Sequence, residues 1–455
     1  MTDTVTRGYW SRAAETMPRE RLRELQWAKL RAQLQHVYKG SPFYHARMSD
    51  VGCRPDDVTG LDDYFARFPL LYRSELLAAE SAAPPYGTLA AVDPALAIAR
   101  HQTSGSSGQP PLRTFDTARD WAWIADMFAR GLYATGIRPG DQVAVVFGYG
   151  MFIGFWAGHY GLQRIGATAI ATGSMDTERR IQLLMDEDIR ALMCTPTYAL
   201  HMAHRAEQMG VDLATRTNIQ LLVVTGEPRP QRTRRLIEKA WGAPALEVAG
   251  MTEVGTLIMF ECGPDAPGMH VIETDVIEEV LDTETKQPVG YGERGVRVMT
   301  TLGREGVTML RYWTNDIVVR QPYHSCSCGR TWDIYQGGIL GRADDVKKIR
   351  GCLFTPSMVE DVARSFDEIE EFQTVLESIG ALDTLIITFE PKPHVTPEVV
   401  ADVATRFGSA VKRAVGVTPL IRIAEIGSLP RFDMKAKRFT DLRSTQHKEV
   451  NVDAS

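Results

Sequence analysis

A run of small residues offers the most distinctive chemistry in this sequence. Its members are Thr103, Ser104, Gly105, Ser106, Ser107 and Gly108. Small residues leave backbone N–H groups and hydroxyls free to surround an anionic group, so the run indicates a phosphate-binding loop. No Lys-Ser or Lys-Thr pair follows the glycines, which excludes a Walker loop. Ser/Gly runs are also typical of flexible linkers, but Trp121 and Trp123 shortly afterwards argue against a linker.

A second group of residues has the chemistry of a metal site. Cys262, His270, Cys326 and Cys328 supply three thiols and an imidazole, which make a complete tetrahedral ligand set for Zn²⁺. His324 could take the place of His270. A site whose four positions are all filled by the protein would be structural, and it would hold the surrounding region together. The alternative is that these cysteines are ordinary buried apolar residues.

Four short segments and one lysine stand out by their order along the chain. They are Thr225–Pro228, Ala249–Glu253, Arg311–Asp316, Gly341–Asp345 and Lys435. Each has an ordinary structural interpretation when it is taken alone. Asp316 could be a turn residue, and Glu253 could be a carboxylate favoured at the start of a helix. Lys435, beside Lys437 and Arg438, could belong to a solvated basic tail.

Together with the Ser/Gly loop, this order resembles the adenylate-forming superfamily of acyl-CoA synthetases, adenylation domains and luciferases. The resemblance is closest to the phenylacetate-CoA ligase branch, and it covers nearly the whole chain. It implies an enzyme that activates a carboxylic acid with ATP and Mg²⁺. The segments that carry the resemblance to this branch are Tyr9-Trp10, Met17–Glu20, Tyr149–Phe152, Thr195–Tyr198, Leu429–Arg431 and Lys435–Arg438.

The resemblance also implies roles for the residues of a nucleotide site. The Ser/Gly loop would close over the β- and γ-phosphates of ATP, Thr252 would contact the α-phosphate, and Glu253 would hold Mg²⁺. Asp316 would accept hydrogen bonds from the ribose hydroxyls, since a carboxylate can take two donors at once. Arg350 would be a further nucleotide contact. The adenine slot would be formed by Gly226, Glu227, Pro228, Ala249, Gly250 and Met251.

By the same resemblance, Lys435 would contact the carboxylate and the α-phosphate during adenylation, where a positive charge stabilises the negative charge that develops. Asp344 would be the hinge on which the C-terminal domain rotates between the two half reactions. Three positions depart from the branch. Gln109 stands where a lysine is usual, Ala249 replaces a tyrosine, and Asp433-Met434 replaces Glu-Gly. These departures leave the acceptor of the acyl group open.

These residues need elements that bring them together. From Asp141 onward, short apolar runs typical of buried parallel strands alternate with helical segments. The strands are predicted at 142–148, 190–195, 219–225 and 245–249, and the helices at 177–187, 197–209 and 230–241. This alternation predicts an α/β fold with a doubly wound parallel sheet. Ligands bind beyond the carboxyl ends of such strands, so the loops 225–228 and 249–253 should face one cleft.

The pattern changes twice further along the chain. After Gly255, strands alternate with turns, which predicts a small β-rich subdomain at about 256–340. A second change near Gly341 separates a large N-terminal domain, residues 1–341, from a small mobile α+β domain, residues 342–455. The second part is long enough to fold separately.

One stretch, from Gln142 to Gln163, contains no charged residue and spaces Gly150, Gly154 and Gly158 like a membrane packing face. We interpret it as strand, glycine loop and buried helix, because Gly148 interrupts it. It is also the candidate wall of an aromatic-acid pocket, since glycines let a ring approach the backbone. A core role is the alternative. The predicted wall comprises Tyr149, Gly150, Phe152, Gly154, Ala171, Thr172 and Gly173.

The composition excludes some classes of protein. The 51 Lys+Arg against 57 Asp+Glu give a net charge of −6, which argues against general nucleic-acid binding. Six cysteines in 455 residues are too few for a disulfide scaffold. We expect no signal peptide in Met1–Ala14, no membrane span and a cytoplasmic protein. A homodimer remains open.

The function predicted is activation of an aromatic carboxylic acid to an acyl-adenylate with release of pyrophosphate, followed by transfer to CoA. The acid would be benzoate-like, with hydroxy- or amino-substituted rings included. One alternative sends the acyl group to an amine or hydroxyl of a second aryl molecule, giving an amide or a benzoxazole. A second alternative, motivated by Gln109 and Ala249, is a nucleotide-binding protein without ligase activity.

Overall fold

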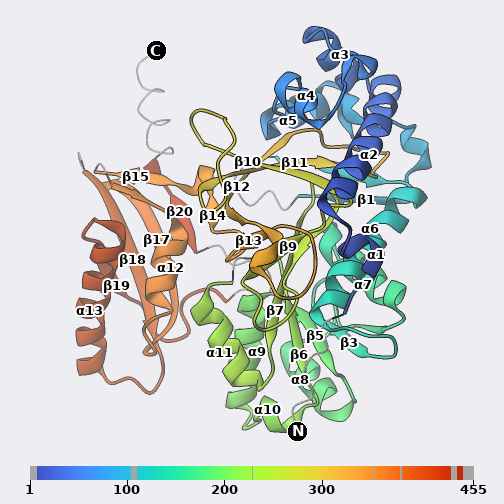
Figure 1. Ribbon diagram of the computed structural model, residues 1–455. Helices are drawn as coiled ribbons and strands as arrows, with labels where there is room; N and C mark the ends of the chain where they lie inside the picture. Colours follow the sequence, from blue (N-terminus) through green and yellow to red (C-terminus); the bar gives the residue numbers. More distant parts are fainter. Residues whose placement is uncertain are drawn as a thin grey trace. The chain divides into compact units, whose positions relative to one another are not determined.

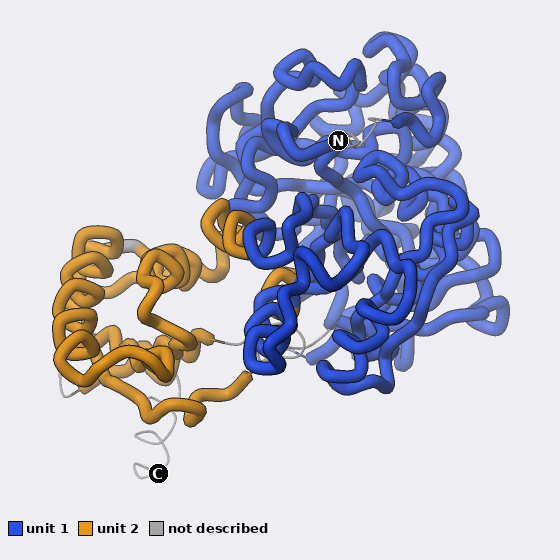
Figure 2. The backbone as a smooth tube through the Cα atoms, turned by 90° about the horizontal axis from the view of Figure 1, so that it is seen from below, with its two compact units in different colours: residues 1–195, 199–226, 237–340 blue, residues 196–198, 227–236, 341–455 orange. Residues whose placement is uncertain are grey.

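The computed structural model describes residues 8–103, 110–227, 229–350, 352–379, 382–431 and 438–443 (Figure 1). Contacts between Cα atoms divide the chain into two compact units (Figure 2). The first comprises residues 1–195, 199–226 and 237–340, and the second comprises residues 196–198, 227–236 and 341–455.

A parallel sheet forms the centre of the first unit. Its strands are β3 (Gln142–Val145), β4 (Thr168–Ala171), β5 (Ala191–Cys194), β6 (Leu221–Val224) and β7 (Ala245–Met251), in the spatial order β4-β3-β5-β6-β7. The register pairs Val143 with both Ala169 and Ala191. Every residue of β5 and β6 is buried, which requires covering layers on both faces. The doubly wound parallel sheet predicted from the sequence is confirmed.

Helices follow the strands as the sequence predicts. Figure 1 shows α6 and α7 on one side of the parallel strands and α9 on the other. Side chains of α6 and α7 pack in one apolar core with Val143, Met193 and Val223. The helices of this region are α6 (Ala118–Thr135), α7 (Ile153–Ile165), α8 (Thr177–Asp186), α9 (Pro196–Gln208), α10 (Leu213–Arg216) and α11 (Gln231–Trp241).

An antiparallel extension continues the same sheet beyond β7. A hairpin joins β7 to β8, and the order then runs β8-β9-β13-β12-β11-β10. This is the β-rich region expected after Gly255. Its strands are β8 (Thr256–Phe260), β9 (Gly268–Val271), β10 (Val276–Leu281), β11 (Arg294–Thr301), β12 (Tyr312–Gln321) and β13 (Ile334–Gln336).

The N-terminal helices pack around a second apolar core of the same unit. This core includes the buried side chains of Leu30, Tyr44, Tyr64, Phe68 and Leu310. A short hairpin, β1 (Ala99–Gln102) with β2 (Arg113–Asp116), brackets the Ser/Gly loop. The helices are α1 (Arg12–Glu15), α2 (Arg19–Gly40), α3 (Pro42–Asp50), α4 (Leu61–Arg67) and α5 (Arg73–Ala82).

The uncharged stretch folds as strand β3, a loop at 146–152 and helix α7. Gly158 lies against Met193 and Gly161 against Phe128, so two of these glycines allow the helix to pack closely on its neighbours. Among the described helices, none combines the length and the apolar character that crossing a bilayer requires.

The second unit contains a sheet of its own, in the order β19-β18-β17-β20. Helices α12 and α13 contribute Val359, Phe407 and Val411 to an apolar core that also contains Phe372 and Ile387 of this sheet. Its elements are β14 (Gly341–Arg342), β15 (Lys347–Ile349), β16 (Cys352–Phe354), α12 (Pro356–Ala363), β17 (Ile369–Ile379), β18 (Leu382–Pro391), α13 (Pro397–Val415), β19 (Leu420–Ile423) and β20 (Phe439–Asp441).

Candidate active site

The carboxyl ends of the parallel strands meet at one edge of the sheet. Tyr149 and Phe152 follow β3, Gly173 follows β4, Gly226 follows β6, and Glu253 follows β7. The chain winds from β3 to β4 on one side and from β5 to β7 on the other. Binding crevices of doubly wound sheets form where the winding reverses, so the edge beyond β3 and β5 is the candidate site.

The segment Ala249–Glu253 is only partly a loop, contrary to the expectation. Ala249, Gly250 and Met251 continue strand β7, and the chain then turns directly into β8. Strand structure persists because these residues pair with β8, a contact that the sequence pattern did not indicate. A Cβ on Gly250 would lie 2.2 Å from the carbonyl oxygen of Thr256, so the hairpin requires glycine here.

A buried arginine fixes the backbone of Glu253. Arg304 is fully buried, binds Asp116 Oδ1 through Nε (3.0 Å) and Nη2 (2.7 Å), and donates from Nη1 to the Glu253 carbonyl at 3.1 Å. Although burial opposes ionisation, Arg304 and His101 hold the pKa of Asp116 below its usual value. Gly255 has a φ of +80°, and a Cβ there would lie 2.7 Å from the Arg304 guanidinium.

The Glu253 carboxylate itself lies against a second arginine, Arg73. Nη1 of Arg73 is 2.5 Å from Glu253 Oε1, and Nη2 donates to the Thr103 hydroxyl at 3.0 Å. The predicted metal ligand and the first residue of the phosphate loop are thus linked through one side chain. Five further residues of the predicted loop, Ser104, Gly105, Ser106, Ser107 and Gly108, lie outside the described residues.

Asp316 occupies an irregular position in strand β12. The register between β11 and β12 shifts around Arg297, and Asn315 has a φ of +65°, which identifies a bulge. The bulge brings Asp316 Oδ2 within 3.1 Å of Nη2 of Arg297, whose side chain is 1% exposed. The same Nη2 is 3.5 Å from Met251 Sδ, so Arg297 connects the predicted ribose acceptor to the predicted adenine slot.

Two predicted adenine-slot residues follow β6. Gly226 has a φ of +92°, a left-handed conformation that favours glycine. Glu227 belongs to the second unit, where its carboxylate accepts hydrogen bonds from the hydroxyl (2.8 Å) and the N–H (3.2 Å) of Thr197. Pro228 lies outside the described residues.

Several residues of the predicted aromatic wall contact one another. A Cβ on Gly173 would lie 2.9 Å from the Tyr149 ring, and one on Gly154 would lie 2.8 Å from the Phe152 ring. The Tyr149 hydroxyl is 3.1 Å from His159 Nδ1. Burial raises the pKa of Tyr149 to about 12 and lowers the pKa of His159, so both side chains are neutral near pH 7. The Tyr149 and His159 side chains of this cluster therefore carry no charge near pH 7.

The remaining wall residues have other surroundings. Gly150 accepts a hydrogen bond at its carbonyl from Trp156 Nε1 at 2.9 Å. Thr172 is buried and donates its hydroxyl to the Val145 carbonyl at 3.1 Å, which supports the end of β3. Ala171 is exposed at the end of β4.

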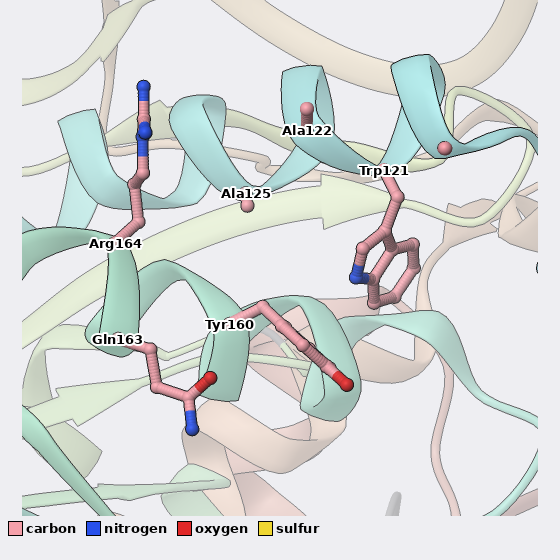
Figure 3. Close-up of a pocket in the computed structure, with 7 residues that line it drawn as sticks. Trp121, Ala122, Ala125, Tyr160, Gln163 and Arg164 are labelled. Carbon is pink, nitrogen blue, oxygen red and sulfur yellow. The ribbon is translucent and has the colours of Figure 1, made fainter.

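A separate shallow hollow of about 460 Å³ lies between α6 and α7. Figure 3 shows Trp121 and Tyr160 reaching toward it from the two helices, and their rings meet edge to face at 5.3 Å. It is distinct from the predicted wall, since the two sets share no residue. It is lined by Ala118, Trp121, Ala122, Ala125, Tyr160, Gln163 and Arg164.

The structure brings the four predicted zinc ligands together. Ligand atoms of Cys262, His270, Cys326 and Cys328 all lie within 4.8 Å of one another, and all four residues are buried. Cys262 Sγ is 3.6 Å from Cys326 Sγ, and Cys328 Sγ is 3.2 Å from His270 Nε2. A tetrahedral ion with Zn–S bonds of about 2.3 Å places sulfurs about 3.8 Å apart, so the donor set fits Zn²⁺. The geometry selects His270, not His324.

The surroundings of the cluster suit a structural site. His270 Nδ1 is 2.9 Å from the Trp332 carbonyl, which turns Nε2 toward the cysteines. The Tyr9 hydroxyl donates to the Cys328 carbonyl at 2.6 Å, which ties the N-terminal segment to the cluster.

Two predicted residues of the second unit make local contacts. Arg350 has a φ of +48°, and its guanidinium donates to the Asp383 carbonyl at 2.9 Å. Asp344 is exposed and pairs with Arg342 at 2.8 Å. Lys435 lies outside the described residues.

The described residues on either side of the segment 432–437 are anchored by ion pairs. Before it, Arg431 pairs with buried Glu390. After it, Arg438 makes a two-pronged contact with Glu371 at 2.7 and 2.9 Å. Arg438 also lies 3.3 Å from Glu360. The backbone that enters and leaves the segment is therefore fixed to β17, β18 and α12.

Sequence reasoning missed two residues that the structure places beside the candidate site, Arg73 and Arg297. Arg297 interrupts an apolar strand, Val296–Thr301, and a charge inside such a run was the available signal. Arg73 gave no comparable signal, since it begins a surface helix 180 residues before its partner Glu253.

Comparisons with known proteins identify the family of the chain. Residues 351–443 match the family model described as AMP-binding enzyme C-terminal domain. The phenylacetate-coenzyme A ligase of Thermus thermophilus is 32% identical over 94% of this chain and 98% of its own length. That of Escherichia coli is also 32% identical, over 94% of this chain and 97% of its own length. The chain belongs to the phenylacetate-CoA ligase family of adenylate-forming enzymes.

A solved structure extends the likeness to three dimensions. The crystal structure of 2-hydroxyisobutyryl-CoA ligase in the postadenylation state, in complex with R3-HIB-AMP, matches with a TM-score of 0.89 and 27% identity. The match covers 100% of this chain and 96% of that chain. The protein is an adenylate-forming acyl-CoA ligase, and enzymes of this family use ATP and CoA. Family membership leaves no support for a nucleotide-binding protein without ligase activity.

Proposed function

We propose that the protein activates a benzoate-like aromatic acid with ATP and transfers the acyl group to CoA. In the first step a carboxylate oxygen attacks the α-phosphorus, the bond to the bridging oxygen breaks, and pyrophosphate leaves. In the second step the CoA sulfur attacks the acyl carbon, AMP leaves, and the thiol proton goes to solvent.

The observation that carries the aromatic substrate is the neutral wall built by Tyr149, Phe152 and Gly173 at the carboxyl edge of β3 and β4. Flat apolar surfaces with small residues suit an aryl ring. The names of the relatives support this choice. Besides the phenylacetate-CoA ligases, a 3-hydroxybenzoate–CoA ligase of Aromatoleum sp. is 26% identical over 73% of this chain and 60% of its own length.

The nucleotide would lie along the edge from β6 to β12. Asp316, oriented by Arg297, would accept the ribose hydroxyls, and Met251 would contact the adenine. Thr252 would contact the α-phosphate. The Glu253 carboxylate fits Mg²⁺, because hard cations take oxygen ligands. Bound there, Mg²⁺ would neutralise phosphate charge during adenylation.

Lys435 is the proposed catalytic cation of the first step, and Asp344 is the proposed hinge between the two steps. Gln109 and Asp433-Met434, which depart from the family pattern, motivate the alternative acceptor, an amine or hydroxyl of a second aryl molecule. The Cys262, His270, Cys326 and Cys328 cluster is the proposed structural zinc site, and it supplies no step of the reaction.

A pyrophosphate-release screen tests the substrate class. The panel contains substituted benzoates, aminobenzoates, phenylacetates and 2-hydroxyisobutyrate, the last because of the structural relative. Release that depends on aryl acids supports the proposal, and release that depends only on the aliphatic acid contradicts it. Product analysis with and without CoA then identifies the acceptor. A thioester formed only with CoA excludes the amide or benzoxazole alternative.

A further inference from the structure

Arg73 reaches three groups that the sequence separates widely. It is the first residue of α5, and its guanidinium donates to Glu253 Oε1 at 2.5 Å, to the Thr103 hydroxyl at 3.0 Å and to the Pro110 carbonyl at 3.3 Å. Thr103 and Pro110 stand on either side of residues 104–109. One cation therefore holds both described ends of the phosphate loop and the carboxylate beside it.

Backbone contacts close the base of the same loop. Thr103 N–H donates to the Leu112 carbonyl at 3.0 Å, and Leu112 N–H donates to the Thr103 hydroxyl oxygen at 2.9 Å. That oxygen also accepts from Arg73, and a hydroxyl that accepts two hydrogen bonds still has its own proton to donate. The Thr103 hydroxyl and the Arg73 guanidinium thus present donors at the foot of the loop.

The loop itself supplies no positive charge. Residues 103–112 contain no charged side chain. A nucleoside triphosphate needs cationic neutralisation, and a guanidinium binds phosphate through paired charge-assisted hydrogen bonds. The Arg73 and Glu253 side chains are only 21% and 11% exposed, so their interaction is poorly screened by water.

We propose that Arg73 is the cation that binds the β- and γ-phosphates of ATP. The inference rests on the proposed function, and it adds a phosphate-binding residue to it. Glu253 holds Arg73 in the nucleotide-free protein, with its own backbone fixed by Arg304. When ATP is bound, Arg73 exchanges the Glu253 carboxylate for phosphate oxygens.

The test is equilibrium binding, because it needs no turnover. Dissociation constants for ATP and for AMP are measured by calorimetry on the full chain, for the wild type and for Arg73→Gln. Loss of a hydrogen bond to a charged group should weaken ATP binding about 10- to 100-fold. AMP has no β- or γ-phosphate, so its affinity should be nearly unchanged. Arg73→Lys keeps the positive charge but cannot make the paired hydrogen bonds of a guanidinium, so the affinity of this variant for ATP should be intermediate.

Arg47→Ala is the matched control. Arg47 pairs with Glu75 of the same helix α5 and is similarly buried, at 13% exposed, but it contacts neither Thr103 nor Glu253. The Arg47→Ala substitution should lower the melting temperature, but the ratio of the ATP and AMP affinities should stay as in the wild type.

Two results would overturn the inference. If Arg73→Gln and Arg73→Lys both keep the wild-type ratio of ATP to AMP affinity, Arg73 is a structural ion pair and the inference alone fails. If the wild-type protein does not bind ATP, the proposed function fails and the inference fails with it.

Discussion

Replacing Asp316 by asparagine should weaken the preference of the enzyme for the ribose hydroxyls of ATP. The carboxylate can accept both ribose hydroxyls, whereas the amide offers one oxygen acceptor and one NH₂ donor. One charge-assisted hydrogen bond is therefore lost, which is worth about 1.5–3 kcal/mol. The KM for ATP in pyrophosphate exchange should rise about 10- to 150-fold, while the KM for the aryl acid should change little.

The same substitution also disturbs a buried ion pair. Arg297 is 1% exposed and lies 3.1 Å from Asp316, and its Nε is 3.8 Å from Glu278. Breaking a buried pair costs about 3–5 kcal/mol, and the loss should be near the lower end because Glu278 remains as a second carboxylate. The free energy of unfolding therefore falls together with the affinity for ATP, and the two effects must be separated.

Arg297→Met separates them. This variant breaks the same ion pair but leaves the Asp316 carboxylate, which can still accept both ribose hydroxyls. It should lose stability and bind ATP more weakly, because Arg297 no longer orients Asp316, but it should still prefer ATP to 2′,3′-dideoxy-ATP more strongly than Asp316→Asn does. Asp316→Asn should reduce that preference, because one of the two hydrogen bonds to the ribose is lost. The assay is competition of the two nucleotides in pyrophosphate exchange, beside denaturant unfolding of both variants. If Asp316→Asn retains the wild-type preference for ATP, Asp316 does not bind the ribose.

Three further predictions concern other parts of the molecule. Cys326→Ser should reduce the zinc content, measured by inductively coupled plasma mass spectrometry, from about one ion per chain to a small fraction. If wild-type protein freed of zinc has the same melting temperature as the untreated protein, the structural zinc site is contradicted. Gly173→Ala places a Cβ 2.9 Å from the Tyr149 ring. The overpacking should cost about 1–3 kcal/mol of folding free energy and displace the Tyr149 ring. The KM for the aryl acid should therefore rise several-fold, with the KM for ATP as an internal control. An unchanged KM for the acid would remove Gly173 from the pocket. Burial opposes ionisation of Glu371, but Arg438 outweighs it and lowers the pKa of Glu371 below its usual 4.5. The ion pair therefore stabilises the folded protein above pH 4.5, and this stabilisation is lost as the pH falls through the lower pKa of the folded state. Below about pH 4.5 the free energy of unfolding should fall more steeply for the wild type than for Glu371→Gln. Parallel pH profiles of the two proteins would refute this.

The parallel part of the fold was predictable because local sequence determines it. Runs such as Ala191–Cys194 and Leu221–Val224 are apolar throughout, which is the pattern expected of strands that are buried on both faces. The hairpin at Ala249–Glu253 was not predictable by the same pattern. Its strand character comes from pairing with β8, and the need for Gly250 arises from a carbonyl oxygen of that partner strand.

The candidate site was predictable where residue type alone limits the choice. The chain has only six cysteines, so the sequence left few candidates for the three thiol ligands of the zinc site. Only the fold distinguishes His270 from His324 as the fourth ligand. The residues that orient the site depend on distant contacts. Arg297 reaches Asp316 through a bulge, and Arg73 reaches Glu253 from another helix, so neither role is visible in a short segment of sequence.

The stoichiometry of the products tests the central claim most directly. Purified protein is incubated with ATP, Mg²⁺, CoA and the best aryl acid of the screen, and nucleotides, pyrophosphate and acyl products are quantified by chromatography and mass spectrometry. We expect equal amounts of AMP, pyrophosphate and aryl-CoA, with none formed when the acid is omitted. ADP and phosphate in place of AMP and pyrophosphate, or no product that depends on an aryl acid, would contradict it.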